Sequence, residues 1–243
     1  NEVVEVADRI TVIRDGKTVD TLDVKDGTVD EDRIIKAMVG RDLTDRYPPR
    51  SVPIGEPVLE VKNWNVYHPL HSDRHTIRDV SLNVRAGEVV GIAGLMGAGR
   101  TEFAMSLFGR SWGQKISGEV LMHGKPVDVS SIPKATKAGL AYVTEDRKTY
   151  GLVLIDHIKH NTTLANLPGV SSRGVVDEMQ ELKVANKYRK DLKIRSSGVF
   201  QTTMNLSGGN QQKVVLAKWL FSGPEVLILD EPTGVLTPAE ADH

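Results

Sequence analysis

The chain has 243 residues, a formal net charge of −1 from 31 basic and 32 acidic residues, and 40% hydrophobic residues. Its length allows one full domain with a sizeable core plus an appendage, and its balanced charge argues against a general affinity for nucleic acid or anionic lipid. The absence of cysteine excludes disulfides and thiolate chemistry. The sequence shows no signal-peptide pattern, and no apolar run approaches the roughly 20 residues that span a bilayer. Any work at a membrane is therefore expected to require an embedded partner.

The first residues predict a small hairpin followed by a helix. Residues 8–20 alternate apolar and polar side chains on both sides of an Asp-Gly pair, which is a strong hairpin signal. Residues 29–40 carry apolar side chains at helical spacing, with Asp30 as the expected cap and Gly40 as the stop. These elements are too few to fold alone.

A proline-rich segment separates this hairpin and helix from the remainder of the chain. Residues 47–57 contain four prolines in eleven positions, a composition that disfavours a helix and predicts an extended linker. We expect a domain boundary near residue 57.

The region after this linker is expected to be an α/β domain, because strand patterns alternate with helical ones. We expect an early β layer, a buried strand leading into a glycine loop, and a charged helical insert. The predicted strands are 58–67, 77–85, 88–93, 118–125, 139–144 and 226–229, and the predicted helices are 102–108, 132–138, 175–194 and 214–221.

The glycine loop has the spacing of a phosphate-binding loop, G-x-x-x-x-G-[basic]-T, between a strand and a helix. Backbone N–H groups of such a loop surround phosphate oxygens, and the helix N-terminus adds its positive dipole end. Alone, the pattern is equally compatible with a structural turn, because Arg stands where the motif asks for Lys. The candidate nucleotide-binding residues are Gly94, Leu95, Met96, Gly97, Ala98, Gly99, Arg100, Thr101 and Glu102.

Two further segments support phosphate chemistry. Residues 205–213 form a polar, glycine-bearing turn that feeds a helix, which is a second helix N-terminus able to face an anion. Residues 226–229 are four consecutive apolar residues, typical of a buried parallel strand, directly before the carboxylates Asp230 and Glu231.

Together these residues resemble the ATP-binding cassette (ABC) ATPases over residues 58–243. Residues 94–101 are similar to Walker A and residues 226–231 to Walker B. The resemblance implies an α/β P-loop NTPase fold with an antiparallel β layer and a helical subdomain at about 150–215. The segment similar to the cassette signature is Leu206, Ser207, Gly208, Gly209, Asn210 and Gln211.

A closer resemblance points to the second cassettes of the tandem subunits that energise bacterial monosaccharide importers of the ribose, xylose, galactose and arabinose type. In that group the loop commonly reads GLMGAGRT, the signature LSGGNQQK, and a Glu-Asp-Arg-Lys segment, here 145–148, precedes Gly-Leu. Arg100 is thus a feature of the subgroup. The resemblance identifies residues 1–46 as the tail of a preceding cassette and 47–57 as the linker between cassettes.

This resemblance implies an ATP-binding and ATP-hydrolysing subunit that uses ATP and Mg²⁺ at the cytoplasmic face of the bacterial inner membrane. Its implied partners are a second cassette, transmembrane permease subunits and, indirectly, a periplasmic sugar-binding protein, with no nucleic acid. The sugar cannot be read from this chain, because specificity would lie in the binding protein and permease.

The implied site roles follow the chemistry of each side chain. Thr101 and Asp230 would hold Mg²⁺, while Glu231 would polarise the attacking water. Arg100 can bind two phosphate oxygens, but its planar head is wider than an ammonium group, which favours binding over fast hydrolysis.

Two other positions also have structural explanations. Glu145 occupies the position of the glutamine that senses Mg²⁺ and contacts the permease in most cassettes, and the resemblance favours this role over a surface charge in a loop. Tyr67 could stack on adenine, with Trp64 as the rival, although an aromatic residue at a strand end is as often core.

In this family a nucleotide lies between the loop of one cassette and the signature of another. The amides of Ser207, Gly208 and Gly209 would therefore complete a partner's γ-phosphate site. We hypothesise that the chain's own loop forms the weaker site and that its signature serves the stronger site opposite.

The sequence departs from the family after Walker B. Cassettes of this type carry a switch histidine on a later strand, and His243 is too close to Glu231 to be that residue. Residues 232–240 resemble a first cassette instead, and residues 7–10 resemble the segment just after a first cassette's switch histidine. We therefore expect a spliced or truncated chain that lacks its last core strands and turns over ATP poorly alone.

Two other functional classes are possible. A non-hydrolysing regulatory cassette that completes a partner's ATP site is favoured by Arg100 and Glu145, whereas the intact Asp230–Glu231 pair favours an ATPase. Soluble cassettes of DNA repair or translation are disfavoured by the neutral charge and the lack of a basic arm.

Overall fold

A computed structural model describes residues 2–14, 16–24, 29, 31–39 and 51–232. The chain divides into two compact units with a boundary between Ser51 and Val52. Several predictions fall outside the described residues: the helix cap Asp30, the helix stop Gly40, the first part of the linker at 47–50, and residues 233–243 with His243.

The first unit contains the predicted hairpin and helix. Strands β1 (Arg9–Arg14) and β2 (Lys17–Asp23) pair antiparallel, and helices α1 (Glu2–Val6) and α2 (Glu31–Val39) accompany them. Alternate residues of β1 are buried, as its alternating sequence pattern predicts, and β2 buries Leu22. The buried core of this unit is Ile10, Val12 and Leu22.

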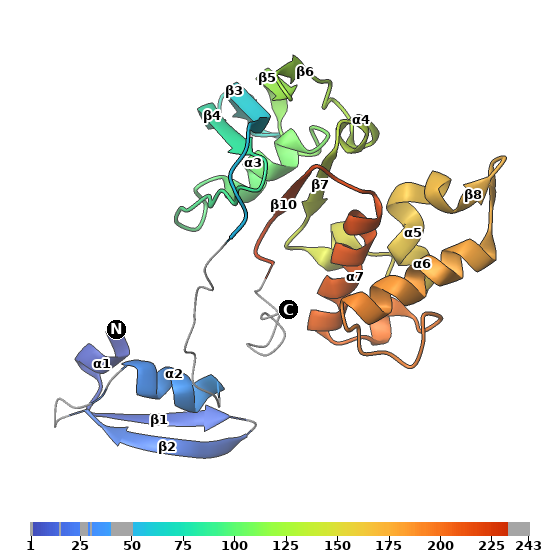
Figure 1. The fold of residues 1–243 in the computed structure, drawn as a ribbon. Helices are drawn as coiled ribbons and strands as arrows, with labels where there is room; N and C mark the ends of the chain where they lie inside the picture. Colours follow the sequence, from blue (N-terminus) through green and yellow to red (C-terminus); the bar gives the residue numbers. More distant parts are fainter. Residues whose placement is uncertain (1, 15, 25–28, 30, 40–50, 233–243) are drawn as a thin grey trace. The chain divides into compact units, whose positions relative to one another are not determined.

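The second unit begins with an antiparallel sheet in the order β4-β3-β5-β6, which confirms the predicted β layer. Figure 1 labels its strands at the top of the ribbon. The strands are β3 (Pro57–Tyr67), β4 (His75–Arg85), β5 (Gln114–Met122) and β6 (Lys125–Pro126).

The central strand β3 changes its phase at a bulge. Val61 and Trp64 both face the core although they lie three residues apart, and the register slips between them. Asn63 has a φ of 51°, and the bulge there places an extra residue on β3 relative to its partner strand. The bulge packs on Gly118, where a Cβ would lie 2.7 Å from the Asn63 carbonyl oxygen. This bulge turns Trp64 inward.

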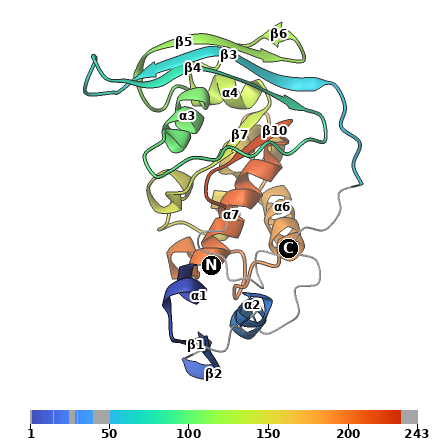
Figure 2. The ribbon, with the colours of Figure 1, turned by 90° about the vertical axis from the view of Figure 1, so that its left-hand side faces the viewer.

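Helix α3 (Arg100–Leu107) packs under this sheet. The Trp64 indole Nε1 donates a hydrogen bond to the Ser106 hydroxyl at 3.0 Å, and both side chains are buried. Phe103 and Leu107 belong to the same core. Figure 2 shows α3 between the antiparallel sheet and two further strands, so the helix is held between two layers.

Those two strands form the central parallel pair. Strand β7 (Leu140–Val143) is completely buried and pairs with β10 (Val226–Leu229) in the register Leu140↔Val226 to Val143↔Leu229. Both strands were predicted from their apolar runs. Their carboxyl ends lie side by side, where the polar residues that follow them meet.

The predicted strand at 88–93 is wrong. In the described part of the chain this segment pairs with no strand, and the side chains of Val89 and Ile92 are 74% and 50% exposed. Apolar sequence gives a strand only where a neighbour supplies the ladder of hydrogen bonds. Among the described residues β10 has that neighbour only in β7.

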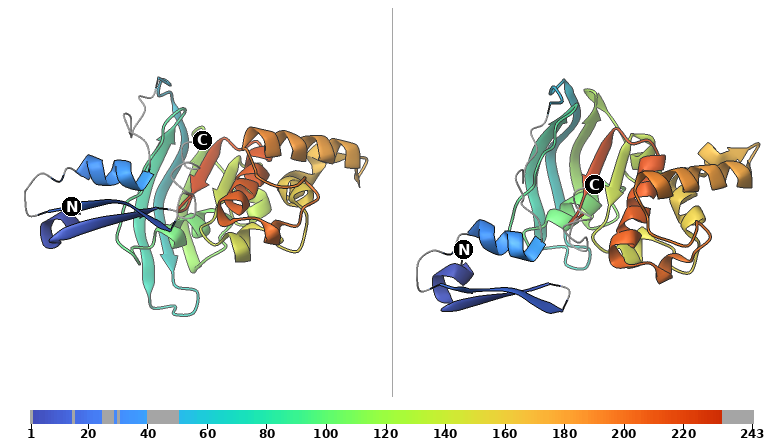
Figure 3. Two further views of the ribbon diagram at one scale, coloured as in Figure 1. Left: turned by 90° about the horizontal axis from the view of Figure 1, so that it is seen from below. Right: turned by 60° about the horizontal axis from the view of Figure 1, so that its bottom comes forward.

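Helices cover the other side of the parallel pair, as Figure 3 shows from two directions. The elements there and in the connections are α4 (Ile132–Lys137), η1 (Arg147–Gly151), α5 (Ile158–Thr163), η2 (Leu164–Val170), β8 (Ser171–Ser172), β9 (Val175–Val176), α6 (Glu178–Asp191), η3 (Thr203–Asn205) and α7 (Gly208–Phe221). Within the described ranges, no helix has the length and apolar character of a membrane span.

Side-chain caps explain why two helix boundaries differ from the predicted ones. The helix predicted at 175–194 starts at Glu178 because the Asp177 carboxylate accepts hydrogen bonds from two backbone N–H groups of its first turn. The helix predicted at 214–221 starts six residues earlier because the Ser207 hydroxyl caps it.

A buried ion pair joins α5 to α6 and makes stability depend on pH. The Lys159 Nζ lies 2.6 Å from Glu181 Oε2, and the Thr163 hydroxyl donates to the same carboxylate. Burial opposes ionisation of Glu181, but these hydrogen bonds outweigh it and lower its pKa below the usual 4.5. The pair therefore stabilises the folded state fully above pH 4.5 and loses that contribution as the pH falls through the lowered pKa.

We expect the free energy of unfolding to decrease as the pH is lowered below 4.5, and Glu181→Gln to remove part of this decrease. Urea unfolding at a series of pH values measures both slopes. Glu178→Gln, on the same helix but exposed, is the control. Equal slopes in the two variants would contradict this role of the ion pair.

Candidate functional site

The glycine loop at 94–99 has the backbone that its sequence requires. Gly97 and Gly99 have φ values of 78° and 93°, in the left-handed region that glycine tolerates. A Cβ at Gly94 would lie 2.9 Å from the Ala98 side chain. Gly99 is followed at once by α3, which has no side-chain cap. The first backbone N–H groups of α3 therefore remain available to an anion.

The other loop side chains leave the loop open. Leu95 and Met96 are 86% and 97% exposed, so their contribution to the loop is through the backbone. Thr101 and Glu102 lie half-buried in the first turn of α3. Thr101 is the second residue of this helix, directly after Arg100.

Asp230 directly follows strand β10 and lines the same cavity as Arg100, the residue that begins α3. The Asp230 N–H donates to the Val143 carbonyl, and the Tyr142 hydroxyl donates to Asp230 Oδ2 at 2.9 Å. Burial, followed by the neighbouring Asp230 carboxylate, raises the pKa of Tyr142 far above its usual value. The hydroxyl therefore keeps its proton and orients the carboxylate.

Arg100, at the start of α3, and Glu231, two residues after β10, form an ion pair. Arg100 Nη1 lies 3.8 Å from Glu231 Oε1, with side chains 36% and 53% exposed. Glu231 has a φ of 45°, a conformation that is uncommon outside glycine. The sequence predicted both residues for the site, but the contact between them was not foreseen.

A cavity of about 600 Å³ lies against these residues. Arg100, Asp230 and Glu231 line one part of it, and the remaining lining comes from β3, β4, residues 86–92, α3, Glu225 and β10. Neither Tyr67 nor any residue of 206–211 lines it. Of residues 94–101, all of which the structure describes, Arg100 alone lines this cavity, where it meets Asp230 and Glu231, and the signature lies elsewhere.

Glu145 also comes to the carboxyl end of the parallel pair. It follows β7 by two residues and is exposed, and the Arg147 N–H donates to its carbonyl. Because Val143 pairs with Leu229, Glu145 emerges on the same sheet edge as Asp230.

The two candidate aromatic residues have different environments. Trp64 is 1% exposed and belongs to the core, so it is not a free stacking surface. The Tyr67 ring stacks on His75 with ring centroids 4.4 Å apart, and Lys115 Nζ lies 5.4 Å from its centroid. His75 begins β4 near the glycine loop, since a Cβ at Gly99 would meet the Ile77 side chain at 2.8 Å.

The predicted signature residues divide into two groups. Ser207 is exposed and Gly208 half-buried at the start of α7, and both can face a ligand, whereas the other four, Leu206, Gly209, Asn210 and Gln211, are buried. Asn210 and Gln211 are buried and hydrogen-bonded: Asn210 Oδ1 accepts from the Arg195 N–H and Gln211 Nε2 donates to the Thr203 carbonyl. We infer that these two side chains support the turn.

The sequence analysis missed Tyr142, which orients Asp230 at the site. Two further missed contacts lie away from the cavity: Arg147 Nε donates to Gln211 Oε1 at 3.1 Å, and the buried Lys218 Nζ donates to the Gly151 carbonyl. Burial lowers the pKa of Lys218 to about 8. A tyrosine inside a buried strand was the available signal, because its hydroxyl must find a partner.

Comparison with known proteins agrees with this geometry. The family model described as ABC transporter matches residues 77–234. The chain is 58% identical to the L-arabinose transport ATP-binding protein AraG of Geobacillus stearothermophilus and 49% identical to the xylose import ATP-binding protein XylG of Thermoanaerobacter pseudethanolicus. It is 45% identical to the ribose import ATP-binding protein RbsA of Bacillus subtilis. Each alignment covers 96% of this chain but only 45–46% of the relative.

Solved structures show the same fold. A nucleotide-free ATP-binding cassette from an ABC transporter superposes with a TM-score of 0.61 at 19% identity, over 76% of this chain and 73% of that one. The ATP-binding cassette MJ0796, in a dimeric post-hydrolysis state bound to ADP and Pi, gives 0.62 at 21% identity, over 76% and 78%. The predicted P-loop NTPase fold is therefore confirmed.

Proposed function

Because the chain belongs to the ABC transporter family, we propose that it binds ATP with Mg²⁺ and hydrolyses it to energise import of a monosaccharide. The observation that carries this proposal is the meeting of Arg100, Asp230 and Glu231 beside the glycine loop. A cation for phosphate, a carboxylate for a metal ion and a carboxylate for water are the groups that phosphoryl transfer requires.

The residues at the loop fit a magnesium nucleotide. A Cβ at Gly94 would clash with Ala98, so the loop is built around glycine backbone, which leaves its N–H groups to phosphate oxygens. Thr101 and Asp230 supply the oxygen ligands that Mg²⁺ prefers. When bound, this ion would neutralise charge on the phosphates, while Asp230 is held in place by Tyr142.

Glu231 is the residue to polarise the attacking water, and Arg100 controls its availability. In the structure the two side chains face each other. A phosphate group competes for the Arg100 guanidinium, because charge-assisted hydrogen bonds to phosphate are strong and can be bidentate. Binding of a nucleotide would therefore release the Glu231 carboxylate.

The transport role rests on the named relatives, which are sugar import ATP-binding proteins. We propose that the chain acts as a peripheral subunit at the cytoplasmic face of the bacterial inner membrane, with a second cassette and permease subunits as direct partners. A periplasmic sugar-binding protein would be an indirect partner. Exposed Ser207 and half-buried Gly208 would complete the partner cassette's γ-phosphate site, and Glu145 would contact the permease.

Arg100→Ala tests nucleotide binding at the loop. We expect it to weaken MgATP affinity by about 10- to 100-fold, because a charged hydrogen-bond donor is lost. Arg100→Lys keeps the charge and should stay within a few-fold of the natural chain. A fluorescent ATP analogue and competition with ATP measure the affinities, with Arg110→Ala at an exposed position as the control.

The outcome of this titration is decisive for the proposal. Affinity unchanged in Arg100→Ala would show that the nucleotide does not bind at the loop. Arg100→Lys also tests the proposed division between a weak and a strong site, because an increase in single-site hydrolysis would support it and an unchanged rate would contradict it.

A further inference from the structure

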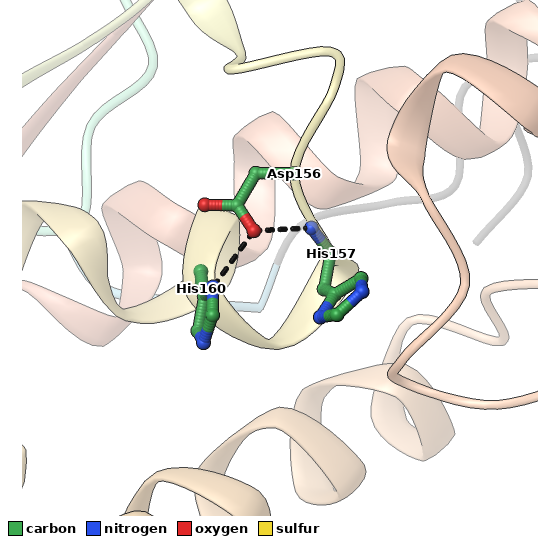
Figure 4. Close-up of side chains that lie close together, drawn as sticks. All are labelled: Asp156, His157 and His160. Atoms are coloured by element: carbon green, nitrogen blue, oxygen red, sulfur yellow. Dashed lines mark hydrogen bonds and ion pairs between the residues drawn. The ribbon is translucent and has the colours of Figure 1, made fainter.

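Asp156, His157 and His160 form a cluster outside the nucleotide site. Each of the three offers one possible ligand atom, and these atoms all lie within 4.8 Å of one another. Asp156 lies two residues before α5, His157 is the N-cap of that helix, and His160 lies in its first turn. Figure 4 shows the two imidazole rings on the same side of the segment, with the Asp156 carboxylate beside them.

The backbone under this cluster is fixed on both sides. The Asp156 carbonyl accepts hydrogen bonds from the Thr203 N–H at 2.9 Å and from its hydroxyl at 3.1 Å. His157 forms a β-bridge with Thr202, and the Ile158 N–H donates to the Gln201 carbonyl. The three side chains therefore project from a segment whose position does not depend on them, as a preorganised site requires.

The His157 ring has unused ligand capacity, whereas His160 Nε2 also lies 4.0 Å from Glu181 Oε2. Asp156 Oδ1 accepts from the His157 N–H and from His160 Nδ1, both at 2.7 Å. Within the described ranges the His157 ring makes only aromatic contacts, with ring centroids 5.5 Å from His160 and 6.0 Å from Phe200. Asp156 and His160 are 38% and 44% exposed. The cluster is thus open to solvent and holds two imidazoles and a carboxylate.

We propose that Asp156, His157 and His160 bind one divalent transition-metal ion such as zinc. Two imidazoles and one carboxylate are a donor set that Zn²⁺ accepts, with water in the remaining position. Coordination through His160 Nδ1 would displace the proton of its hydrogen bond with Asp156, and this proton would be released to solvent. The nearby Glu181 is not a ligand, because Lys159 and Thr163 already occupy its carboxylate.

The test is a zinc titration of the whole chain after treatment with a chelator and desalting. Competition with a chromophoric chelator gives the affinity, and Co²⁺ absorption in the visible reports nitrogen and oxygen ligands directly. We expect one ion per chain, and at least about a 10-fold loss of affinity in His157→Gln and in His160→Gln. His123→Gln should bind as the natural chain does.

The control is matched, because His123 also pairs with a carboxylate, Glu225, but among the described residues it belongs to no group of three possible ligands. Circular dichroism checks that each variant is folded. If His160→Gln unfolds the helix, His157→Gln still decides, because in the described residues its ring makes no hydrogen bond. Absence of zinc uptake, or equal affinity in His157→Gln and His123→Gln, would overturn the proposal.

Discussion

If Glu231 polarises the attacking water as proposed, we expect its replacement with glutamine to lower the rate of ATP hydrolysis by about 10²- to 10⁴-fold, the range that a positioned general base supplies. Glutamine keeps the shape of the side chain but cannot accept the proton of the attacking water. ATP affinity should be retained or increase slightly, because the variant also frees Arg100 from its ion pair. Single-turnover hydrolysis with the protein in excess, together with ATP titration, separates the two effects.

Glu225→Gln is the matched control for this experiment. Glu225 is also exposed, flanks β10 and lines the same cavity, but it lies at the opposite end of the strand from Asp230 and Glu231. Its substitution should leave the hydrolysis rate unchanged. If Glu231→Gln hydrolyses ATP as fast as the natural chain, the water is activated elsewhere and the role of Glu231 is wrong.

Truncating Trp64 to alanine lowers the free energy of unfolding by about 3–5 kcal/mol. The indole is 1% exposed, fills the space between β3 and α3, and donates its hydrogen bond to Ser106. Trp64→Phe keeps most of the volume but leaves the Ser106 hydroxyl without this donor, which costs about 1 kcal/mol. Urea unfolding followed by circular dichroism measures both changes without relying on tryptophan fluorescence.

An exposed aromatic residue provides the reference for this series. Tyr150 is 65% exposed, and Tyr150→Ala should change stability by no more than about 0.5 kcal/mol. Similar losses in Trp64→Ala and Tyr150→Ala would show that the layer between β3 and α3 is not well packed. The expected order is Trp64→Ala, then Trp64→Phe, then Tyr150→Ala.

The site was predictable where residue type and neighbours along the chain determine it. Gly97 and Gly99 identified the loop because its backbone needs glycine, and Asp230 and Glu231 were located because an apolar strand precedes them. The ion pair between Arg100 and Glu231 was not predictable, because it joins side chains that only the folded sheet brings together. The Tyr142 hydrogen bond to Asp230 is non-local in the same way.

The fold was predictable to a similar depth. Strands β3 and β4 follow from alternation, but the bulge at Asn63 does not, since a positive φ at a residue other than glycine leaves no clear signal. The bulge decides which side chains of β3 face α3. The strand predicted at 88–93 shows the reverse case, in which the sequence carries a signal that the fold does not use. Its apolar residues indicate a strand, but a strand forms only where a neighbour pairs with it, and among the described residues none does.

The unpaired apolar run at 88–93 also affects the tendency of the purified protein to aggregate in solution. Val89 and Ile92 present β-branched side chains to water next to backbone groups that, in the described part of the chain, belong to no ladder. Such a segment is a template for pairing with another molecule, up to fibrillar aggregates. With a net charge of only −1, colloidal repulsion between chains is weak. Aggregation should therefore increase steeply with protein concentration, and a charged residue in place of Val89 should reduce it.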